Sequence, residues 1–469
     1  MMDFAGLAHG FAVLFSPGVL AACVLGLLAG AVAGFLPGLS LVGGLALQFA
    51  FLGLAFLIFG LESPAVFAVA FAYGMLYGRA LAAINFNAIE TGDAGPYPKR
   101  AAPALIAVPL IGIAAVIVVG LLVAPSSALK LSFGPAENAA FVLFLLLAGV
   151  AFSRGSVAGA LAMVGLGLLL RTVGTDPETG VTRLTFGLDA LSDGLGILDI
   201  ALGLFVVANV IDDVVRAAAS RVHATASDGP PAGLFPSIAL AMLAGLFPTN
   251  GSLAATTAGA QRSRPRPGLF DPASQNSMPD IMRAALLSDI RLSVSLIPVL
   301  LLALPFDPVT VLLRNTIMGQ AVISKELTTT VWLVCATMIL AHVLPLIVVI
   351  YLARVRWRPI RLDARFVAPF LLALCCFVSW RLNDTSFGGI FVMLAFGAIG
   401  YGMIWAGLDR SVLFFAFAIS GTLEENIRRS LLISRGDVTV FAERPIVAAL
   451  IGAGLLLLFG VRLWRSVRH

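Results

Sequence analysis

The sequence predicts an all-α polytopic membrane protein, and three observations support this fold class. Of its 469 residues, 59% are hydrophobic and only 12% are charged, whereas about a quarter of the residues in a soluble domain are charged. Apolar runs near the ~20-residue length that crosses a bilayer recur from end to end of the chain. No polar stretch between them is long enough to fold as a soluble domain. We therefore predict about 11–13 membrane segments in two inverted-repeat-like halves, with broken or re-entrant helices.

The predicted segments follow the apolar runs in chain order. The stretch HATASDGPPAG (223–233) is rich in Pro, Gly and small residues, which is typical of a linker. It separates a first transmembrane half, 1–222, from a second half, 234–469, which ends in a tail. The segments cover 19–36, 41–61, 64–84, 101–123, 137–152, 156–172, 194–211, 232–247 with a broken continuation to 260, 284–305, 308–322, 328–352, 366–381, 386–407, a short 411–421 and 445–463.

One apolar stretch in each half carries its own helix break. AGAVAGFLPGLSLVGG (29–44) contains Pro37-Gly38 near its middle. Proline removes a backbone donor and glycine adds backbone freedom, so we predict that the helix unwinds here. Aligning AGFLPGLSL (33–41) with AGLFPTNGSL (244–253) superposes Pro37 on Pro248. One break at a matching place in each half predicts an internal repeat.

A helix broken within the membrane exposes groups that bind ions. Free N–H groups at the start of one half-helix suit an anionic carboxylate, and unwound carbonyls at the end of the other suit Na⁺ or a proton carrier. Neutral side chains near the breaks can add oxygen and amide ligands. The alternative is that small residues here only let helices pack closely. The side chains concerned are Ser40, Asn85 and Asn87 in the first half and Thr249, Asn250, Ser252, Thr256 and Thr257 in the second.

Arg79 is the only charged residue between Glu62 and Glu90. A charged side chain within a span is costly, so Arg79 indicates a functional site. Its guanidinium group would bind a substrate carboxylate through two parallel hydrogen bonds. Two alternatives stay open: Arg79 reaches the headgroups from the end of the span, or it pairs with Glu90 in a structural ion pair.

Basic residues predict the orientation of the chain. The net charge is +5, and Lys and Arg gather in short loops such as RVRWRPIRLDAR (354–365), in QRSRPRPG (261–268) and in the tail RLWRSVRH. Short cytoplasmic loops hold an excess of Lys and Arg. We therefore place 354–365 and the C-terminus in the cytoplasm.

The cysteines and histidines do not predict a metal site. None of the histidines has a second His or a carboxylate three or four residues further on, and the cysteines lie in apolar runs without ligand spacing. We expect small buried cysteines and, at position 342, a hydrogen-bonded packing residue. The residues are Cys23, Cys335, Cys375 and Cys376, and His9, His223, His342 and His469.

Two charged stretches predict local structure. GTDPETG contains Asp176 and Glu178 around a proline and reads as a turn. TLEENIRRS (422–430) has Thr422 followed three residues later by Glu425, which predicts a capping box at a helix start.

An intramembrane enzyme is the alternative from another functional class. NVIDDVVR places Asn209, Asp212 and Asp213 at the end of a span, as in the metal–diphosphate site of a membrane prenyltransferase. Such an enzyme needs a second acidic cluster to bind Mg²⁺, and the sequence has none. It also lacks a Gly-x-Ser-x-Gly elbow and a paired-His motif. We therefore predict no catalytic residue and no cofactor.

Five stretches resemble the large membrane subunit of tripartite tricarboxylate transporters, the TctA family. The resemblance covers most of the chain, and 173–205 and 423–446 are long and polar enough to be specific. The stretches are GFLPGLSLVGGLAL (34–47), AYGMLYGRALAAINFNA (72–88), FGPAENAAFVLFLL (133–146), VGTDPETGVTRLTFGLDALSDGLGILDIALGLF (173–205) and LEENIRRSLLISRGDVTVFAERPI (423–446).

This resemblance implies a cation-coupled secondary transporter in the bacterial inner membrane, a symporter driven by Na⁺ or H⁺. It would import carboxylates such as citrate with two partners, a small membrane subunit and a periplasmic solute-binding protein. The Pro-Gly-Leu element of the family corresponds to Pro37, Gly38 and Leu39. Its Tyr-Gly pairs correspond to 73–74 and 77–78, and its following Asn to Asn87.

The chain also departs from the family pattern. Arg79 stands where the pattern has a second glycine, and no Pro-Gly follows Asn87. In the second half Pro248-Thr249 replaces Pro-Gly, and ALPFDPVTVLL (303–313) replaces Gly-Ile-Pro-Gly. These departures leave open a second alternative, a membrane scaffold or sensor that no longer transports.

The two predicted helix breaks, the charge of Arg79 and the family resemblance together define the predicted site. For substrate binding we predict Pro37, Gly38, Leu39, Ser40, Tyr77, Gly78, Arg79, Asn85, Asn87, Thr249, Asn250, Gly251 and Ser252. For the coupling cation we predict Gly38, Ser40, Asn87, Thr249, Asn250 and Thr256.

Overall fold

The structure is a computed structural model of the full chain. It describes residues 4–36, 39–60, 63–91, 109–114, 116–117, 134–153, 155–176, 179–188, 191–218, 245, 278–324, 327–352, 364–383 and 387–467. The predicted linker at 223–233 and the predicted second break at 248–252 lie outside these residues, as do the loops at 261–268 and 354–363.

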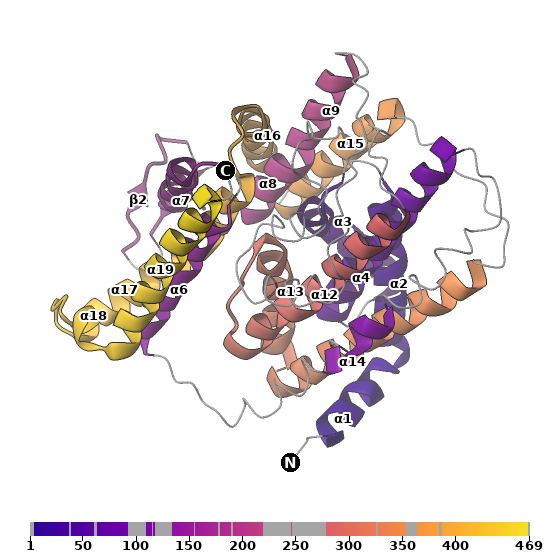
Figure 1. Ribbon diagram of the computed structural model, residues 1–469, viewed down its shortest axis with the longest axis horizontal. Helices are drawn as coiled ribbons and strands as arrows, with labels where there is room; N and C mark the ends of the chain where they lie inside the picture. Colours follow the sequence, from indigo (N-terminus) through magenta and orange to yellow (C-terminus); the bar gives the residue numbers. More distant parts are fainter. Residues whose placement is uncertain are drawn as a thin grey trace.

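Helices make up nearly all of the described chain, which confirms the all-α prediction (Figure 1). The exceptions with regular structure are the two short strands of one antiparallel hairpin, β1 and β2, in which Gly174 pairs with Arg183. The elements are α1 (Phe4–Leu14), α2 (Pro17–Phe35), α3 (Leu41–Phe59), α4 (Pro64–Thr91), α6 (Pro135–Ala151), α7 (Val157–Arg171), β1 (Gly174–Thr175), β2 (Thr182–Arg183), α8 (Ile197–Leu202), the π-helical turn η2 (Gly203–Val207), α9 (Ala208–Ala218), α12 (Met278–Leu302), α13 (Pro308–Ser324), α14 (Leu327–Leu352), α15 (Ala364–Leu382), α16 (Gly388–Ala406), α17 (Arg410–Ile433), α18 (Val440–Glu443) and α19 (Pro445–Val467).

Several helices are apolar enough to lie in a membrane. Within the described residues, Pro17–Phe35, Pro64–Ala82 and Gly388–Ala406 have the length and hydropathy to cross a bilayer, and six further apolar helices are shorter. The chain is therefore a multi-pass membrane protein, as its composition predicts. At the predicted first break, α2 ends at Phe35 and α3 begins at Leu41.

The helices pack in three neighbouring groups (Figure 1) that share one large apolar core, and a small separate apolar cluster lies between α6 and α19. The first group contains α1–α4 with α12, α13 and α14. The second contains α6, α7, α17 and α19, and the third contains α15 and α16 packed on α8, η2 and α9. Helix α17 joins the groups, since it also contacts α13, α16 and α8. Segments from both predicted halves therefore meet along α17.

Helices α2 and α4 lie so close together that their contact requires glycine. A side chain at Gly26, Gly30 or Gly34 of α2 would run into the backbone of α4. A side chain at Gly74 or Gly78 of α4 would likewise run into the backbone of α2. Small residues spaced four apart let helix backbones approach in a membrane, where packing rather than water drives association.

We expect Gly30→Ala to destabilise the protein by about 1–3 kcal/mol, because the added methyl group would overlap the carbonyl oxygen of Phe71. Thermal unfolding of the purified protein in detergent measures this. The matched control is Gly53→Ala in α3, where a methyl group meets nothing within 4 Å. Equal melting temperatures for the two variants would contradict the proposed α2–α4 contact.

The capping box predicted at Thr422 is wrong. Helix α17 runs without interruption from Arg410 to Ile433, so Thr422 lies in its middle. The helix begins after Asp409, whose carboxylate accepts a hydrogen bond from the Ser411 N–H at 3.1 Å. An existing helix adds one hydrogen bond per residue, whereas a new start would leave N–H groups without partners. Continuation past Gly421 is therefore favoured over a second start.

Candidate functional site

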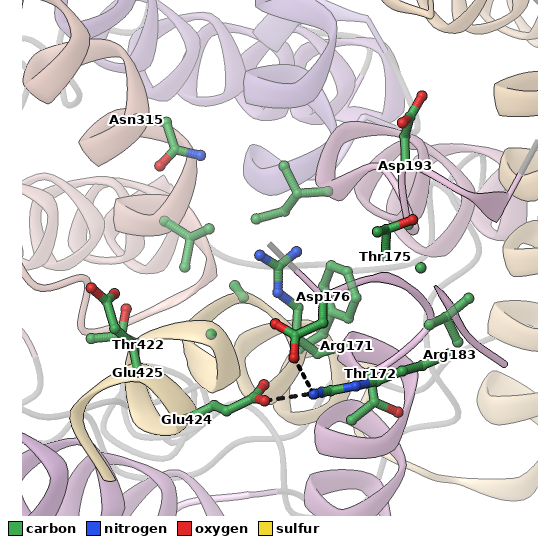
Figure 2. A pocket seen from close by; sticks show the side chains of 18 of the residues that line it. Arg171, Thr172, Thr175, Asp176, Arg183, Asp193, Asn315, Thr422, Glu424 and Glu425 are labelled. Atoms are coloured by element: carbon green, nitrogen blue, oxygen red, sulfur yellow. Dashed lines mark hydrogen bonds and ion pairs between the residues drawn. The ribbon is translucent and has the colours of Figure 1, made fainter. Parts of the chain in front are cut away.

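A cavity of about 790 Å³ opens where the hairpin, α13 and α17 meet (Figure 2). Its walls come from the end of α7, from 172–176 and 193–197, from 305–315 and from 417–428. The end of α7, 172–176 and 193–197 belong to the predicted first half. The segments 305–315 and 417–428 belong to the second half. Two stretches of the specific family resemblance, 173–205 and 423–446, thus meet around one cavity.

The hairpin and the loop after it form one wall by close backbone contact. Gly174 has φ +117°, and a Cβ atom there would lie 2.6 Å from the Cα atom of Gly194. Next to it, the Thr175 N–H and hydroxyl both donate to the Ser192 carbonyl, each at 2.8 Å. The predicted turn is present, since the Gly180 N–H donates to the Asp176 carbonyl at 2.8 Å. Glu178 lies outside the described residues.

A network of ion pairs ties this wall to α17. Asp176 is buried, with 5% of its surface exposed, although the sequence assigned it only to a turn. It pairs with Arg183 and with Arg428, the latter at 3.4 Å. Both arginines also pair with Glu424 at 3.1 Å. Figure 2 shows Arg183 between the two carboxylates. These four charges neutralise one another. The pair of Asp176 and Arg428 joins residues that are 252 positions apart in the chain.

Two further arginines line the cavity without a carboxylate partner among the described residues. Arg171, at the end of α7, places its guanidinium carbon 5.8 Å from the centre of the Phe417 ring. Gly421 leaves room for it, since a Cβ atom there would lie 3.2 Å from Arg171 Nε. Arg314 of α13 donates through Nε to the Ala303 carbonyl at the end of α12. Its two terminal nitrogens make no hydrogen bond that involves another described residue.

The charges of the described lining residues balance, because four arginines face four carboxylates. Glu425 pairs with Arg429 on the same helix. Asp193 is the one remaining acidic lining residue in the described part of the chain, and Figure 2 shows it apart from Asp176 and Glu424. Arg171 and Arg314 are the two lining arginines that no carboxylate pairs within the described part of the chain. An anion entering the cavity would therefore meet two positioned guanidinium groups.

The helix that runs from 197 to 218 contains a π-helical turn, η2, next to the predicted first break. A π turn widens the helix and alters the partners of its carbonyls, and such turns are frequent at functional sites. The Phe205 carbonyl accepts from Asn209 Nδ2 at 2.8 Å and from Ser40 Oγ at 3.4 Å. Arg410 donates to the Leu204 carbonyl and to Asn209 Oδ1. The break before α3, the turn and the start of α17 therefore form one connected polar cluster.

Ser40 also caps α3, because its Oγ accepts a hydrogen bond from the Gly43 N–H at 3.1 Å. We expect Ser40→Ala to cost about 1 kcal/mol of stability through loss of this cap. Ser156→Ala is the matched control, because Ser156 caps α7 through Gly159 at 3.0 Å. A chemical denaturation series on both variants measures the cost. If transport activity falls only in Ser40→Ala, Ser40 has a role in the predicted binding site beyond capping α3. Equal transport activity in the two variants would limit Ser40 to capping.

The predicted site residues that the structure describes lie just before α3 and on α4, and none of them lines the cavity. Leu39 is buried with 5% exposed, and Gly78 packs against Ala31 of α2. Tyr77 is partly buried beside His342, with ring centres 6.4 Å apart. Arg79 is exposed and makes no hydrogen bond or ion pair with any residue that the structure describes. Their roles in binding stay predictions.

The other predicted site residues are only partly covered. Asn85 and Asn87 lie on the last turns of α4, and their side chains are not described. The rest fall outside the described residues: Pro37, Gly38, Thr249, Asn250, Gly251, Ser252 and Thr256.

Sequence reasoning missed the cavity arginines and a buried carboxylate–imidazole pair. Asp289 Oδ2 of α12 lies 3.0 Å from His342 Nε2 of α14. A signal existed for each charged group, because Arg171, Asp289 and Arg314 all fall within predicted spans. The argument used for Arg79, that a charged side chain within a span indicates a functional site, would also have selected these three residues. His342 is hydrogen-bonded as expected, to the Met338 carbonyl on its own helix and to Asp289 on α12.

The alternative of a metal-dependent enzyme gains no support from the described residues. The Asn209 side chain is hydrogen-bonded to the Phe205 carbonyl and to Arg410. In the part of the chain that is described, no three His, Cys, Asp or Glu side chains are grouped so that they could hold a metal. The four cysteines are unpaired, and all but Cys376 are buried, as expected of small core residues.

Interrupted apolar helices and a polar cavity between helix groups define a multi-pass membrane protein. Residues 20–414 match the profile of the Tripartite tricarboxylate transporter TctA family. The chain therefore belongs to this family of transporter membrane subunits.

Two relatives come from Agrobacterium vitis, and both are described as uncharacterized. The 52.8 kDa protein in the TAR-I ttuC' 3' region is 26% identical over 488 residues, which covers 97% of this chain and 95% of that protein. The protein in the TAR-II ttuC' 3' region is 30% identical over 168 residues, 34% of this chain and 69% of that protein. No solved structure matches the chain.

Proposed function

We propose that the chain imports di- or tricarboxylates such as citrate across the inner membrane by symport with Na⁺ or H⁺. It would work with the two other components of a tripartite system, a small membrane subunit and a periplasmic solute-binding protein that delivers the substrate. The C-terminus would lie in the cytoplasm, in keeping with its basic residues.

The observation that carries the proposal is the pair of guanidinium groups of Arg171 and Arg314 at a cavity of about 790 Å³. This volume is in the usual range of small-molecule sites, roughly 300–1,000 Å³. Guanidinium groups bind carboxylates with two parallel charge-assisted hydrogen bonds. Two of them on different helices suit a substrate with two or more carboxylates. The ion pairs between Asp176, Arg183, Glu424 and Arg428 keep the neighbouring charges from competing for it.

The position of the cavity also supports the proposal. Substrate sites of secondary transporters lie where structural repeats meet, beside discontinuous helices. The cavity has walls from both predicted halves, and Ile197 in its lining begins the helix with the π-helical turn. A substrate bound there would touch elements that contact the break before α3.

Uptake into proteoliposomes tests the proposal. The vesicles would hold this chain and its small subunit, with the binding protein outside and inward gradients of Na⁺ or H⁺ applied separately. We expect accumulation of at least one radiolabelled di- or tricarboxylate, and none of labelled glucose. Vesicles without the chain are the control. Absence of uptake of every carboxylate under both gradients would contradict the proposal.

A further inference from the structure

A buried hydrogen-bonded network joins α4, α12 and α14 in the middle of the first helix group. Asp289 and His342 are 1% and 0% exposed, and the atoms Oδ2 and Nε2 lie 3.0 Å apart. Ionisable groups inside a membrane protein are costly and mark proton or ion pathways. The cavity and the ion-pair network around Asp176 do not include this pair.

The hydrogen bonds of His342 define how many protons the pair holds. His342 Nδ1 lies 2.6 Å from the Met338 carbonyl, which can only accept, so Nδ1 carries a hydrogen. The contact between Nε2 and Asp289 Oδ2 then needs a hydrogen of its own. It is either on Nε2, giving an imidazolium and a carboxylate, or on Oδ2, giving an imidazole and a carboxylic acid. In both cases the pair has no net charge.

Loss of that one proton would change the pair in a definite way. A neutral imidazole with its hydrogen on Nδ1 would then present the Nε2 lone pair to a carboxylate oxygen 3.0 Å away. Two acceptors at this distance repel each other, and a net charge of −1 would remain in a buried position. The two side chains would then move apart, and the contact that joins α12 to α14 would be lost.

The surroundings hold the pair in place and leave an acceptor open. Tyr73 donates to Ser293 Oγ at 2.9 Å, because the Ser293 hydroxyl donates to the Asp289 carbonyl at 3.0 Å. The Tyr73 ring lies against His342, with centres 4.7 Å apart. Asp289 Oδ1 and the Tyr77 hydroxyl are both buried, and neither has a hydrogen-bond partner in the part that is described. Asp289 Oδ1 can therefore accept a hydrogen bond from a water molecule that reaches the pair.

We propose that Asp289 and His342 form the coupling site of the transporter and that the coupled ion is a proton. The proton would come from water on one side, be held between Nε2 and Oδ2, and leave to water on the other side. The pair would alternate between net charges of 0 and −1. This inference rests on the proposed function, since coupling requires transport. Na⁺ fits less well, because hard cations are bound by several oxygens and here an imidazole nitrogen faces the carboxylate.

No other group around the pair is suited to this role at neutral pH. Tyrosine and cysteine ordinarily titrate near 10 and 8.5, and arginine stays charged. On α12, Arg291 is held by Asp307 at 3.1 Å. The titratable or charged side chains described on the pair's own helices and on those packed against them are Tyr73, Tyr77 and Arg79 on α4, Arg291 on α12, Arg314 on α13, Cys335 on α14, Cys23 on α2 and His9 on α1, which is exposed.

The first experiment tests proton binding without any transport. Infrared difference spectra of the purified protein would be recorded between about pH 5 and about pH 9, where buried carboxyl and imidazole groups titrate. We expect a pH-dependent carboxyl or imidazole band that both Asp289→Asn and His342→Gln remove. Asp199→Asn is the matched control. Asp199 is a buried carboxylate that accepts from Ser379 and Asn383 instead of a histidine, and its loss should leave the band. A wild-type spectrum without such a band would overturn the proposal.

The second experiment separates coupling from transport. Exchange of labelled for unlabelled citrate across the vesicle membrane needs no gradient, whereas net accumulation under an inward H⁺ gradient needs coupling. We expect Asp289→Asn to retain exchange within about threefold and to lose accumulation. Accumulation by Asp289→Asn at the wild-type level, or wild-type accumulation driven by Na⁺ alone, would overturn the proposal. If the wild type exchanges no carboxylate, the proposed function fails, and the infrared result still decides the proton site.

Discussion

Replacing Arg171 or Arg314 by Gln is expected to weaken carboxylate binding about 10- to 100-fold. A hydrogen bond to a charged group contributes roughly 1.5–3 kcal/mol, and each 1.4 kcal/mol is a factor of about ten in Kd. Equilibrium dialysis of labelled citrate against the purified protein measures the change. The double variant is expected to bind citrate too weakly to detect.

The type of substitution tests how the carboxylate is bound. Arg314→Lys keeps the positive charge but loses the planar fork, so its Kd is expected to lie between those of the wild type and Arg314→Gln. Arg381→Gln is the matched control, because Arg381 is exposed at the end of α15 and does not line the cavity. Its Kd should equal that of the wild type.

One outcome would show that the carboxylate binds outside this cavity. If Arg171→Gln and Arg314→Gln both bind citrate as the wild type does, the cavity is not the carboxylate site. The predicted site around Ser40 and Arg79 would then be the place to test, with Arg79→Gln in the same assay.

Hydropathy predicted most of the helices, because burial in lipid depends on the composition of each segment and not on its partners. The predicted segments 41–61 and 328–352 correspond to α3 at Leu41–Phe59 and α14 at Leu327–Leu352. The interruption between α2 and α3 was also predicted from a local signal, because a proline lacks the backbone donor that continues a helix. Features of this kind can be derived from sequence alone.

The cavity and the contact between Asp289 and His342 could not be predicted in this way, because the residues that meet there are far apart in the chain. Asp289 and His342 are 53 positions apart, and Asp176 and Arg428 are 252 apart. Searching for a partner three or four residues away finds only contacts on the same helix. The capping box failed for a related reason, since Thr422 satisfies the local pattern while the helix before it continues.

Loss of the ion pairs beside the cavity is expected to lower the stability of the protein. We expect Asp176→Ala to destabilise the protein by about 1–3 kcal/mol, since a buried carboxylate that two arginines share would be lost. The effect is reduced because the side chains of Arg183 and Arg428 are 35% and 28% exposed and partly solvated. Thermal unfolding of the purified protein measures the loss.

A control variant and a measurement of citrate affinity test whether the effect is specific to Asp176. Glu425→Gln removes the exposed pair with Arg429, and its cost should stay below about 0.5 kcal/mol. Asp176→Ala also releases positive charge beside the cavity, so the same variant is expected to bind citrate at least as tightly as the wild type. Lower stability with unchanged or tighter binding would show that Asp176 holds the wall together without touching the substrate. A large loss of affinity at full stability would contradict that role, because a carboxylate that repels the substrate cannot contribute to its binding.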